Sequence, residues 1–284
     1  MAEKNDKTYK QYIHISFDDV YACIKDITDR ADTYDTIFRN DFFAWLREMN
    51  QTYGAVFTLY TFNNDNHAAD YDISNLPDRY AAELTDNAGW LKFGFHAKDN
   101  LKKYDVDEIE DIKADYGKFT EAILRASGGC AECIDRVNRL GFFAGSRANV
   151  EALQTCDYGL LGLLTADNSE ERISYYFDAE LTKELNRAGE YRDETNGLLF
   201  LRSQLRLESV TDMEAQFARI RSYTLPKVIE LFTHEQCFYG ASPVKGYTVK
   251  GLLEEYIRWA KENGYGFNFA MNLYSKCQTK PKSL

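Results

Sequence analysis

The sequence predicts a single α/β domain built around a mainly parallel sheet, either open or closed into a barrel. Segments with strand signals alternate with segments with helix signals along most of the 284 residues. The chain has only four prolines and no linker rich in proline, glycine or serine. We therefore expect one domain over 1–284, with flexible ends at 1–11 and 275–284. In such folds the chemistry takes place at the carboxyl ends of the strands.

The first strand is expected over 12–17, where apolar residues alternate with His14 and Ser16. It runs directly into Asp18 and Asp19. Two adjacent carboxylates repel each other, which raises one pKa unless a cation, such as a metal ion, lies beside them. The alternative is that the pair only ends the strand in a solvated turn, where aspartate is favoured. We interpret His14 as a structural histidine of the barrel.

Helices are expected where apolar residues recur three or four positions apart and a glycine ends the pattern. The segments 40–53 and 249–263 are the clearest, because Gly54 and Gly264 follow them directly. The expected helices are 40–53, 77–84, 106–127, 130–140, 150–155, 213–223 and 249–263.

Strands are expected in the short apolar runs between these helices. They are 12–17, 55–62, 91–95, 141–144, 159–164, 173–177, 198–201, 205–207, 227–232 and 267–271. Three of these strands lead to residues that bind metals or move protons, namely Asp18–Asp19, His96 and His234. The chain has only four histidines, so two of them at strand ends is an enrichment.

Composition excludes several classes of function. The formal net charge is -11 and the pI is about 5.0, which argues against binding to nucleic acid or to anionic membranes. No apolar run approaches the roughly 18 residues of a spanning helix, and the N-terminus has no apolar signal region. We expect a cytoplasmic protein, or a secreted one whose signal has been removed. The six cysteines are too few for a disulfide scaffold.

Some residues permit two interpretations. The pair Cys130 and Cys133 could be redox-active at a helix start, but we favour simple packing. Arg206 and Glu208 share one face of an expected strand, where they could pair with each other or stand at the rim of a site. Glu235 could orient a neighbouring group or be solvated. The tyrosines that could form a substrate surface are Tyr175, Tyr176, Tyr191 and Tyr239.

At the level of motifs, the chain resembles the polysaccharide deacetylases of carbohydrate esterase family 4, over residues 12–271. Phe17-Asp18-Asp19 is similar to the first motif of that family, and Phe93-Gly94-Phe95-His96 to its second. Leu231-Phe232-Thr233-His234 resembles its last motif. The resemblance implies a distorted barrel of about seven parallel strands.

The resemblance also implies roles for individual residues. Asp18 would be the general base and His234 the general acid. Asp19 and His96 would ligate a divalent metal, zinc above all, with cobalt or nickel as alternatives. The family has a second histidine four residues after the first, and here that position is Asn100, which would be a weaker third ligand.

The third motif is the most altered. The segment Gly141-Phe142-Phe143-Ala144-Gly145 lacks the arginine that the family has after the aromatic residue, and it lacks the proline. Arg147 is expected as a substitute for that arginine. Ser146 and Asp99 complete the residues that we expect to bind substrate.

The implied reaction is hydrolysis of an N-acetyl or O-acetyl group on a carbohydrate, with a metal that polarises the carbonyl and activates water. Asp18 would take the proton of the water, and His234 would protonate the leaving group. Two alternatives remain open at this stage. The chain could be a non-catalytic carbohydrate-binding or regulatory relative that has lost the metal, or a hydrolase of the same fold that acts on a non-sugar amide.

Overall fold

The computed structural model describes residue 9, residues 11–167 and residues 172–274. The flexible ends expected at 1–11 and 275–284 lie outside these residues, apart from Tyr9 and Gln11, and Gln11 is buried. Among the described residues, no helix has both the length and the apolar character to cross a membrane.

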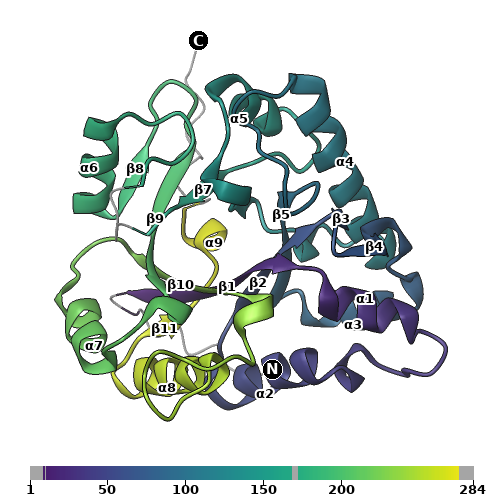
Figure 1. Ribbon diagram of the computed structural model, residues 1–284, viewed down its shortest axis with the longest axis horizontal. Coiled ribbons are helices and arrows are strands. Elements are labelled where there is room, and N and C mark those ends of the chain that lie inside the picture. Colours follow the sequence, from purple (N-terminus) through teal and green to yellow (C-terminus); the bar gives the residue numbers. More distant parts are fainter. Residues whose placement is uncertain (1–8, 10, 168–171, 275–284) are drawn as a thin grey trace, which may run out of the picture.

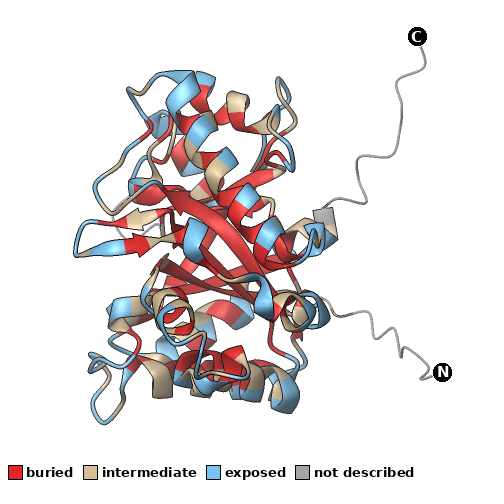
Figure 2. Cartoon of the chain, turned by 90° about the vertical axis from the view of Figure 1, so that its right-hand side faces the viewer, coloured by how far each residue is buried: buried red, intermediate tan, exposed pale blue. Residues whose placement is uncertain are grey.

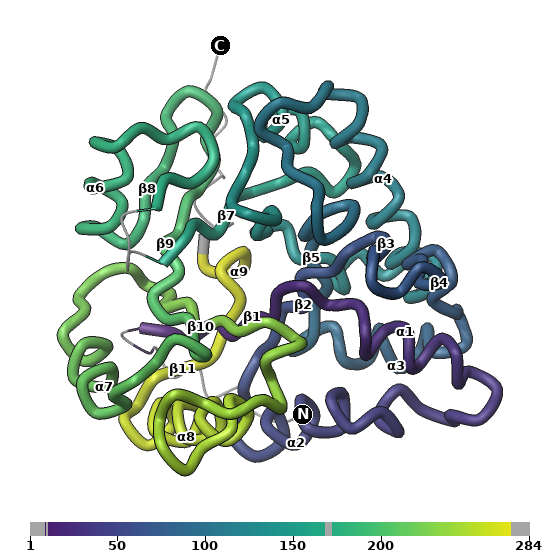
Figure 3. Tube along the Cα trace, in the orientation of Figure 1, coloured from purple at the N-terminus to yellow at the C-terminus, as the bar shows by residue number. Residues whose placement is uncertain are grey.

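Seven parallel strands form a nearly closed barrel, which confirms the expected fold class (Figure 1). In spatial order they are β5 (Leu91–Ala97), β2 (Phe57–Phe62), β1 (Tyr12–Val20), β10 (Val228–His234), β9 (Leu199–Arg206), β7 (Gly162–Thr165) and β6 (Val137–Asn138). The two edge strands approach each other just before β6, where the amide N of Asp135 donates to the carbonyl O of Phe93 at 2.7 Å. Figure 3 shows β1, from the start of the chain, beside β10 from its last quarter.

Helices surround the barrel, so its strands are buried on both faces (Figure 2). They are α1 (Ala22–Asp29), α2 (Asp41–Tyr53), α3 (Ala81–Asn87), α4 (Ile109–Ala126), α5 (Arg147–Gln154), α6 (Ala179–Ala188), α7 (Met213–Ser222), α8 (Val249–Glu262) and α9 (Ala270–Tyr274). Short strands complete the fold: β11 (Gly266–Phe267) pairs with β1, β8 (Glu190–Arg192) pairs with β9, and β3 (Asn64–Asp65) pairs with β4 (Ala68–Asp72).

The alternation in β1 separates two buried environments. Phe17 faces the helices, with its ring 4.8 Å from that of Phe42 in α2. His14, Ser16 and Asp18 face the barrel interior, and all three are buried. The period-2 pattern therefore predicts the strand correctly, but its polar face is an internal layer of charged and polar groups that is almost completely shielded from solvent.

Four expected elements are wrong. The segment 130–140 is no helix: it holds a 3-10 turn, Ala131–Cys133, and then strand β6. Its buried Ile134, Val137 and Leu140 recur every third residue, which imitates a helix, but they pack inward from extended chain. The segment 141–144 is a 3-10 turn, 173–177 has no strand, and 267–271 has only the end of β11 followed by α9.

Two further expectations can be compared with the structure. The expected strands 198–201 and 205–207 are one strand, β9. Cys130 and Cys133 have free thiols, and burial raises the pKa of the Cys133 thiol to about 12, which favours the packing role.

Candidate active site

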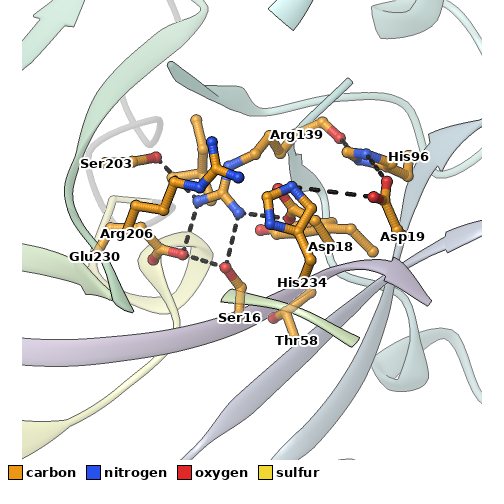
Figure 4. A network of polar contacts seen from close by, with 12 residues as sticks. Ser16, Asp18, Asp19, Thr58, His96, Arg139, Ser203, Arg206, Glu230 and His234 are labelled. Atoms are coloured by element: carbon orange, nitrogen blue, oxygen red, sulfur yellow. Dashed lines mark hydrogen bonds and ion pairs between the residues drawn. The ribbon is translucent and has the colours of Figure 1, made fainter. Parts of the chain in front are cut away.

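A cavity of about 340 Å³ lies at the carboxyl ends of the barrel strands. Residues at or just beyond the ends of β1, β2, β5, β6, β7, β9 and β10 line it. They are Asp18, Asp19, Phe62, His96, Asn100, Arg139, Leu140, Gly141, Phe142, Phe143, Ala166, Asp167, Arg172, Arg206, Phe232 and His234. The three strand ends singled out in the sequence therefore meet in one place, which Figure 4 shows from close by.

A bend in the backbone brings both adjacent aspartates to this cavity. Successive residues of a strand point to opposite faces, so Asp19 would normally face away from Asp18. At Asp19, however, φ is 56°, and the register between β1 and β2 shifts between Phe17 and Val20. Aspartate tolerates this left-handed conformation better than most residues. The bulge thus places two carboxylates on the same cavity.

His96 presents one ring nitrogen to Asp19. Its Nδ1–H donates to the backbone carbonyl of Arg139 at 2.6 Å, so Nε2 is the atom directed at the cavity. That Nε2 lies 3.2 Å from Asp19 Oδ1. Burial alone would raise the pKa of Asp19, but the hydrogen bond and charge of His96 hold it well below its usual range.

His234 approaches Asp19 from the other side, with its Nε2 4.0 Å from Asp19 Oδ2. Its Nδ1–H donates to Glu208, which also accepts from Arg206 Nε at 2.9 Å. Burial would lower the pKa of His234, but the hydrogen bond to Glu208 and the nearby carboxylates raise it above its usual value. The same contact lowers the pKa of Glu208 to about 2, against the effect of burial. The pairing of Arg206 with Glu208 that the sequence suggested is therefore present.

Arg139 is a site residue that the sequence analysis missed. It follows β6, its side chain is fully buried, and its Nη1 donates to Asp18 Oδ1 at 2.6 Å. The guanidinium lies over the ring of Phe232, 4.2 Å from its centroid. The signal was an arginine two residues before the segment beginning at Gly141 that we compared with the third motif. The incorrect helix over 130–140 concealed it.

Asn100 lines the cavity, but its side-chain oxygen accepts from Asn66 Nδ2 at 2.8 Å. Asp99 uses its carboxylate within its own loop, where Oδ1 accepts from the amides of Leu101 and Lys102 at 2.9 and 3.0 Å. The side chain of Asp99 is not among those that line the cavity.

Ser146 and Arg147 also lie outside the cavity lining. The Ser146 side chain caps α5, accepting from the amide of Asn149 at 3.2 Å. Arg147 Nη1 pairs with Asp193 at 2.9 Å and with Glu151 at 3.3 Å. The expected substitute for the family arginine therefore has partners elsewhere, and the arginine that contacts Asp18 is Arg139.

Glu235, directly after His234, links two segments of the chain beside the site. Its carboxylate accepts from the amides of Tyr21, Ala22 and Cys23 at 2.7 to 2.9 Å, at the start of α1. It thereby joins the end of β10 to the segment that follows Asp19.

Two groups of residues offer ligand atoms for a cation. One is Asp19 and His96, with Asn100 in the same cavity. The other is Glu208, His234 and Cys237, whose ligand atoms all lie within 4.8 Å of one another. In the second group the guanidinium of Arg206 already contacts the Glu208 carboxylate, which disfavours a further cation there. The first group, with two oxygen donors and one nitrogen donor, fits a divalent metal better.

No protein-family model and no curated protein sequence matches the chain. Solved structures, in contrast, match it over almost its full length. A protein assigned as a polysaccharide deacetylase of Mycobacterium smegmatis has a TM-score of 0.58 at 12% identity, covering 97% of this chain and 94% of that one.

Two other solved structures agree with this similarity. A family 4 acetyl xylan esterase of Clostridium thermocellum, in complex with a cobalt ion, has a TM-score of 0.50 at 12% identity and covers 94% of this chain and 91% of that one. Agd3, described as a novel carbohydrate deacetylase, has a TM-score of 0.52 at 9% identity and covers 92% of this chain and 52% of that one. The chain therefore has the fold of the polysaccharide deacetylases.

Proposed function

We propose that the protein is a metal-dependent hydrolase that removes an acetyl group from an N- or O-acetylated carbohydrate. The observation that carries this proposal is the convergence of Asp18, Asp19, His96 and His234 on one cavity at the carboxyl ends of the strands. An acid, a base and a pair of metal ligands are the groups that hydrolysis of an amide or ester needs.

Asp19 and His96 would hold the metal, and Asn100 would complete the protein ligands. A bound divalent metal supplies Lewis acidity, which polarises the acetyl carbonyl and lowers the pKa of water. The backbone carbonyl of Arg139 fixes the tautomer of His96, as partners of ligand histidines commonly do.

Asp18 is the proposed general base. Its carboxylate accepts a hydrogen bond from Arg139 Nη1 at 2.6 Å and lines the cavity, where a water molecule could reach it. Because the side chain is nearly completely buried and held by one short hydrogen bond, it keeps a fixed direction toward the cavity.

His234 is the proposed general acid. An amine or an alkoxide leaves poorly without a proton, so the acid has to be protonated when the bond breaks. Glu208 accepts from Nδ1 and raises the pKa of His234, which favours the protonated ring with a proton on Nε2 facing the cavity.

The proposed carbohydrate would occupy the mouth of the cavity. Phe142 is 44% exposed there, and a flat apolar ring suits the C–H face of a sugar. Arg172 and Arg206 line the same cavity and would donate hydrogen bonds to sugar hydroxyls and to the acetyl oxygen.

The test is a calorimetric titration of chelator-stripped protein with zinc, cobalt and nickel, followed by measurement of acetate release from chitin oligosaccharides and O-acetylated xylan. We expect one metal per chain and metal-dependent release. His96→Ala should abolish both. His67→Ala is the matched control, because His67 is an exposed histidine outside the cavity lining and its loss should change neither.

One observation favours a second candidate, a non-catalytic carbohydrate-binding relative. Asn100 stands where the family has a second histidine, and its side-chain oxygen is already engaged by Asn66. In that case millimolar metal would not bind, and the His96→Ala variant would retain affinity for chitin oligosaccharides.

A further inference from the structure

Below the candidate active site, the barrel interior contains a charged layer that the proposed chemistry does not use. It consists of Arg139, Glu230, His14 and Ser16, all of them fully or almost fully buried. In Figure 4, dashed lines join Arg139 to Asp18 and to Ser16, Glu230 and Ser203. Buried charges are costly unless each has a partner, so the arrangement of the partners indicates what the layer does.

The two terminal nitrogens of the Arg139 guanidinium contact two different carboxylates. Nη1 donates to Asp18 at 2.6 Å and to Ser16 Oγ at 2.9 Å. Nη2 donates to Glu230 Oε1 at 3.0 Å and to Ser203 Oγ at 2.9 Å. Glu230 is thus the only other carboxylate that an ion pair joins to Arg139 within the described residues.

Glu230 is itself held from three directions. On β10 it stands opposite His14 of β1, and its Oε2 accepts from His14 Nδ1 at 2.6 Å. Its Oε1 accepts from the Ser16 hydroxyl as well as from Arg139. Burial would raise the pKa of Glu230, but His14 and Arg139 lower it, so the carboxylate is ionised.

The hydrogen bonds also identify the charge of His14. Its Nε2 lies 2.9 Å from Thr58 Oγ1, and that hydroxyl donates its one hydrogen to Asp135 at 2.6 Å. Thr58 therefore accepts from Nε2–H, while Nδ1–H donates to Glu230. A histidine that donates from both nitrogens is an imidazolium. Arg139 thus pairs with the carboxylates of Asp18 and Glu230, and His14 pairs with Glu230 and lies 4.0 Å from a third buried carboxylate, that of Asp135.

We propose that Glu230 is a positioning residue, whose carboxylate, fixed by His14 and Ser16, holds the guanidinium of Arg139 against Asp18. This inference rests on the proposed function, because it makes Glu230 act on the base through Arg139. Glu230 does not line the cavity and touches no substrate. Its contribution is to give Arg139 a second anchor, so that the arginine keeps one orientation toward Asp18.

The test is Glu230→Gln, which keeps the size of the side chain and removes its charge. We expect kcat for acetate release to fall by about 10- to 100-fold with KM within about 2-fold of wild type, as for loss of a group that supports a reacting residue. In an Arg139→Met background, the same substitution should cause no further loss, because residues that act as a unit are not additive.

Asp193→Asn is the matched control. Asp193 is also a buried carboxylate paired with an arginine, but it lies outside the cavity lining. The kcat of Asp193→Asn should stay within about 2-fold of wild type, because Asp193 contacts neither the proposed acid, His234, nor the proposed base, Asp18. If Glu230→Gln does not fold, Glu230→Asp keeps the charge, shortens the side chain by one methylene, and should still lower kcat with KM unchanged.

A crystal structure of Glu230→Gln gives a second measurement that does not depend on activity. We expect Arg139 to move out of hydrogen-bond distance of Asp18. A retained Arg139–Asp18 hydrogen bond, an unchanged kcat, or losses that multiply in the double variant would each overturn the inference. A wild-type protein without deacetylase activity would instead count against the proposed function, and the crystal structure would still decide the role of Glu230.

Discussion

The polar residues in and above the barrel interior form two layers that differ in how completely their members are paired. The closed layer lies in the interior and consists of Arg139, Glu230, His14, Ser16 and Asp18, and the open layer faces the cavity and consists of Asp19, His96 and His234. In the lower, closed layer the side chains of Arg139 and Glu230 are 0% and 1% exposed, and the Arg139 contacts to Asp18 and Glu230 measure 2.6 and 3.0 Å. In the upper, open layer Asp19 is 26% exposed, and its contacts to His96 and His234 measure 3.2 and 4.0 Å.

This difference indicates that the closed layer stabilises the fold, whereas the open layer can bind a ligand. Each charged side chain of the closed layer already has an oppositely charged partner within the chain. The open layer leaves Nε2 of both histidines directed at one carboxylate, with solvent access to it. Substitutions in the closed layer should therefore affect stability most, and those in the open layer should affect ligand binding most.

The largest effect is expected from Arg139→Met, which removes the cation of the closed layer. Asp18 and Glu230 would be left as buried carboxylates that repel each other. We expect the free energy of unfolding to fall by about 3–5 kcal/mol, which is typical when one partner of a buried ion pair is lost. Urea denaturation followed by circular dichroism measures this change.

Arg147→Met is the control for that experiment. The Arg147 side chain is 47% exposed although it also pairs with two carboxylates, so its loss should cost about 1 kcal/mol or less. Similar losses for the two variants would show that the closed layer contributes no more than a surface ion pair.

The sequence predicted the open layer, together with Asp18 of the closed layer, much better than the other residues of the closed layer. Asp18, Asp19, His96 and His234 follow apolar strands, and parallel strands bring their carboxyl ends together, so local pattern and topology suffice to gather them. Arg139 could not be found in this way. The strand before it, β6, has only two residues, and the helix-like spacing of the apolar residues around it led to the incorrect helix over 130–140.

Glu230 and His14 were recognisable as polar residues within strands, but not as partners. Their contact depends on the register between β1 and β10, which pairs residues more than 200 positions apart along the chain. The direction of the Asp19 side chain could not be predicted either, because it depends on a positive φ at this residue that the sequence did not reveal.

A smaller effect is expected in the open layer from Asn100→His. An imidazole in place of the amide would give the cavity a stronger nitrogen ligand, so we expect the affinity for zinc or cobalt to rise by about tenfold or more. Calorimetric titration of the chelator-stripped variant measures this change. Asn66→Ala is the control, because it frees the Asn100 oxygen without adding a ligand and should change the affinity by less than about threefold. An unchanged affinity in Asn100→His would mean that position 100 does not face the ion.

The last effect is spread over several pH units and concerns the charge of His14. Burial would lower the pKa of His14, but Glu230 and Asp135 raise it above its usual value, against the opposing charge of Arg139. A raised pKa in the folded state stabilises the fold fully below the unfolded value of about 6.5, and this contribution is lost as pH rises through the folded pKa.

Wild-type protein should therefore lose stability at alkaline pH with a slope of up to about 1.4 kcal/mol per pH unit from this group, whereas His14→Gln should lack that part of the slope. Urea unfolding between pH 6 and pH 9 provides the comparison. His234→Gln is run in parallel, because the pKa of His234 is also raised and contributes in the same direction. Parallel stability curves for wild type and His14→Gln would contradict a raised pKa for His14 and the imidazolium inferred from its hydrogen bonds.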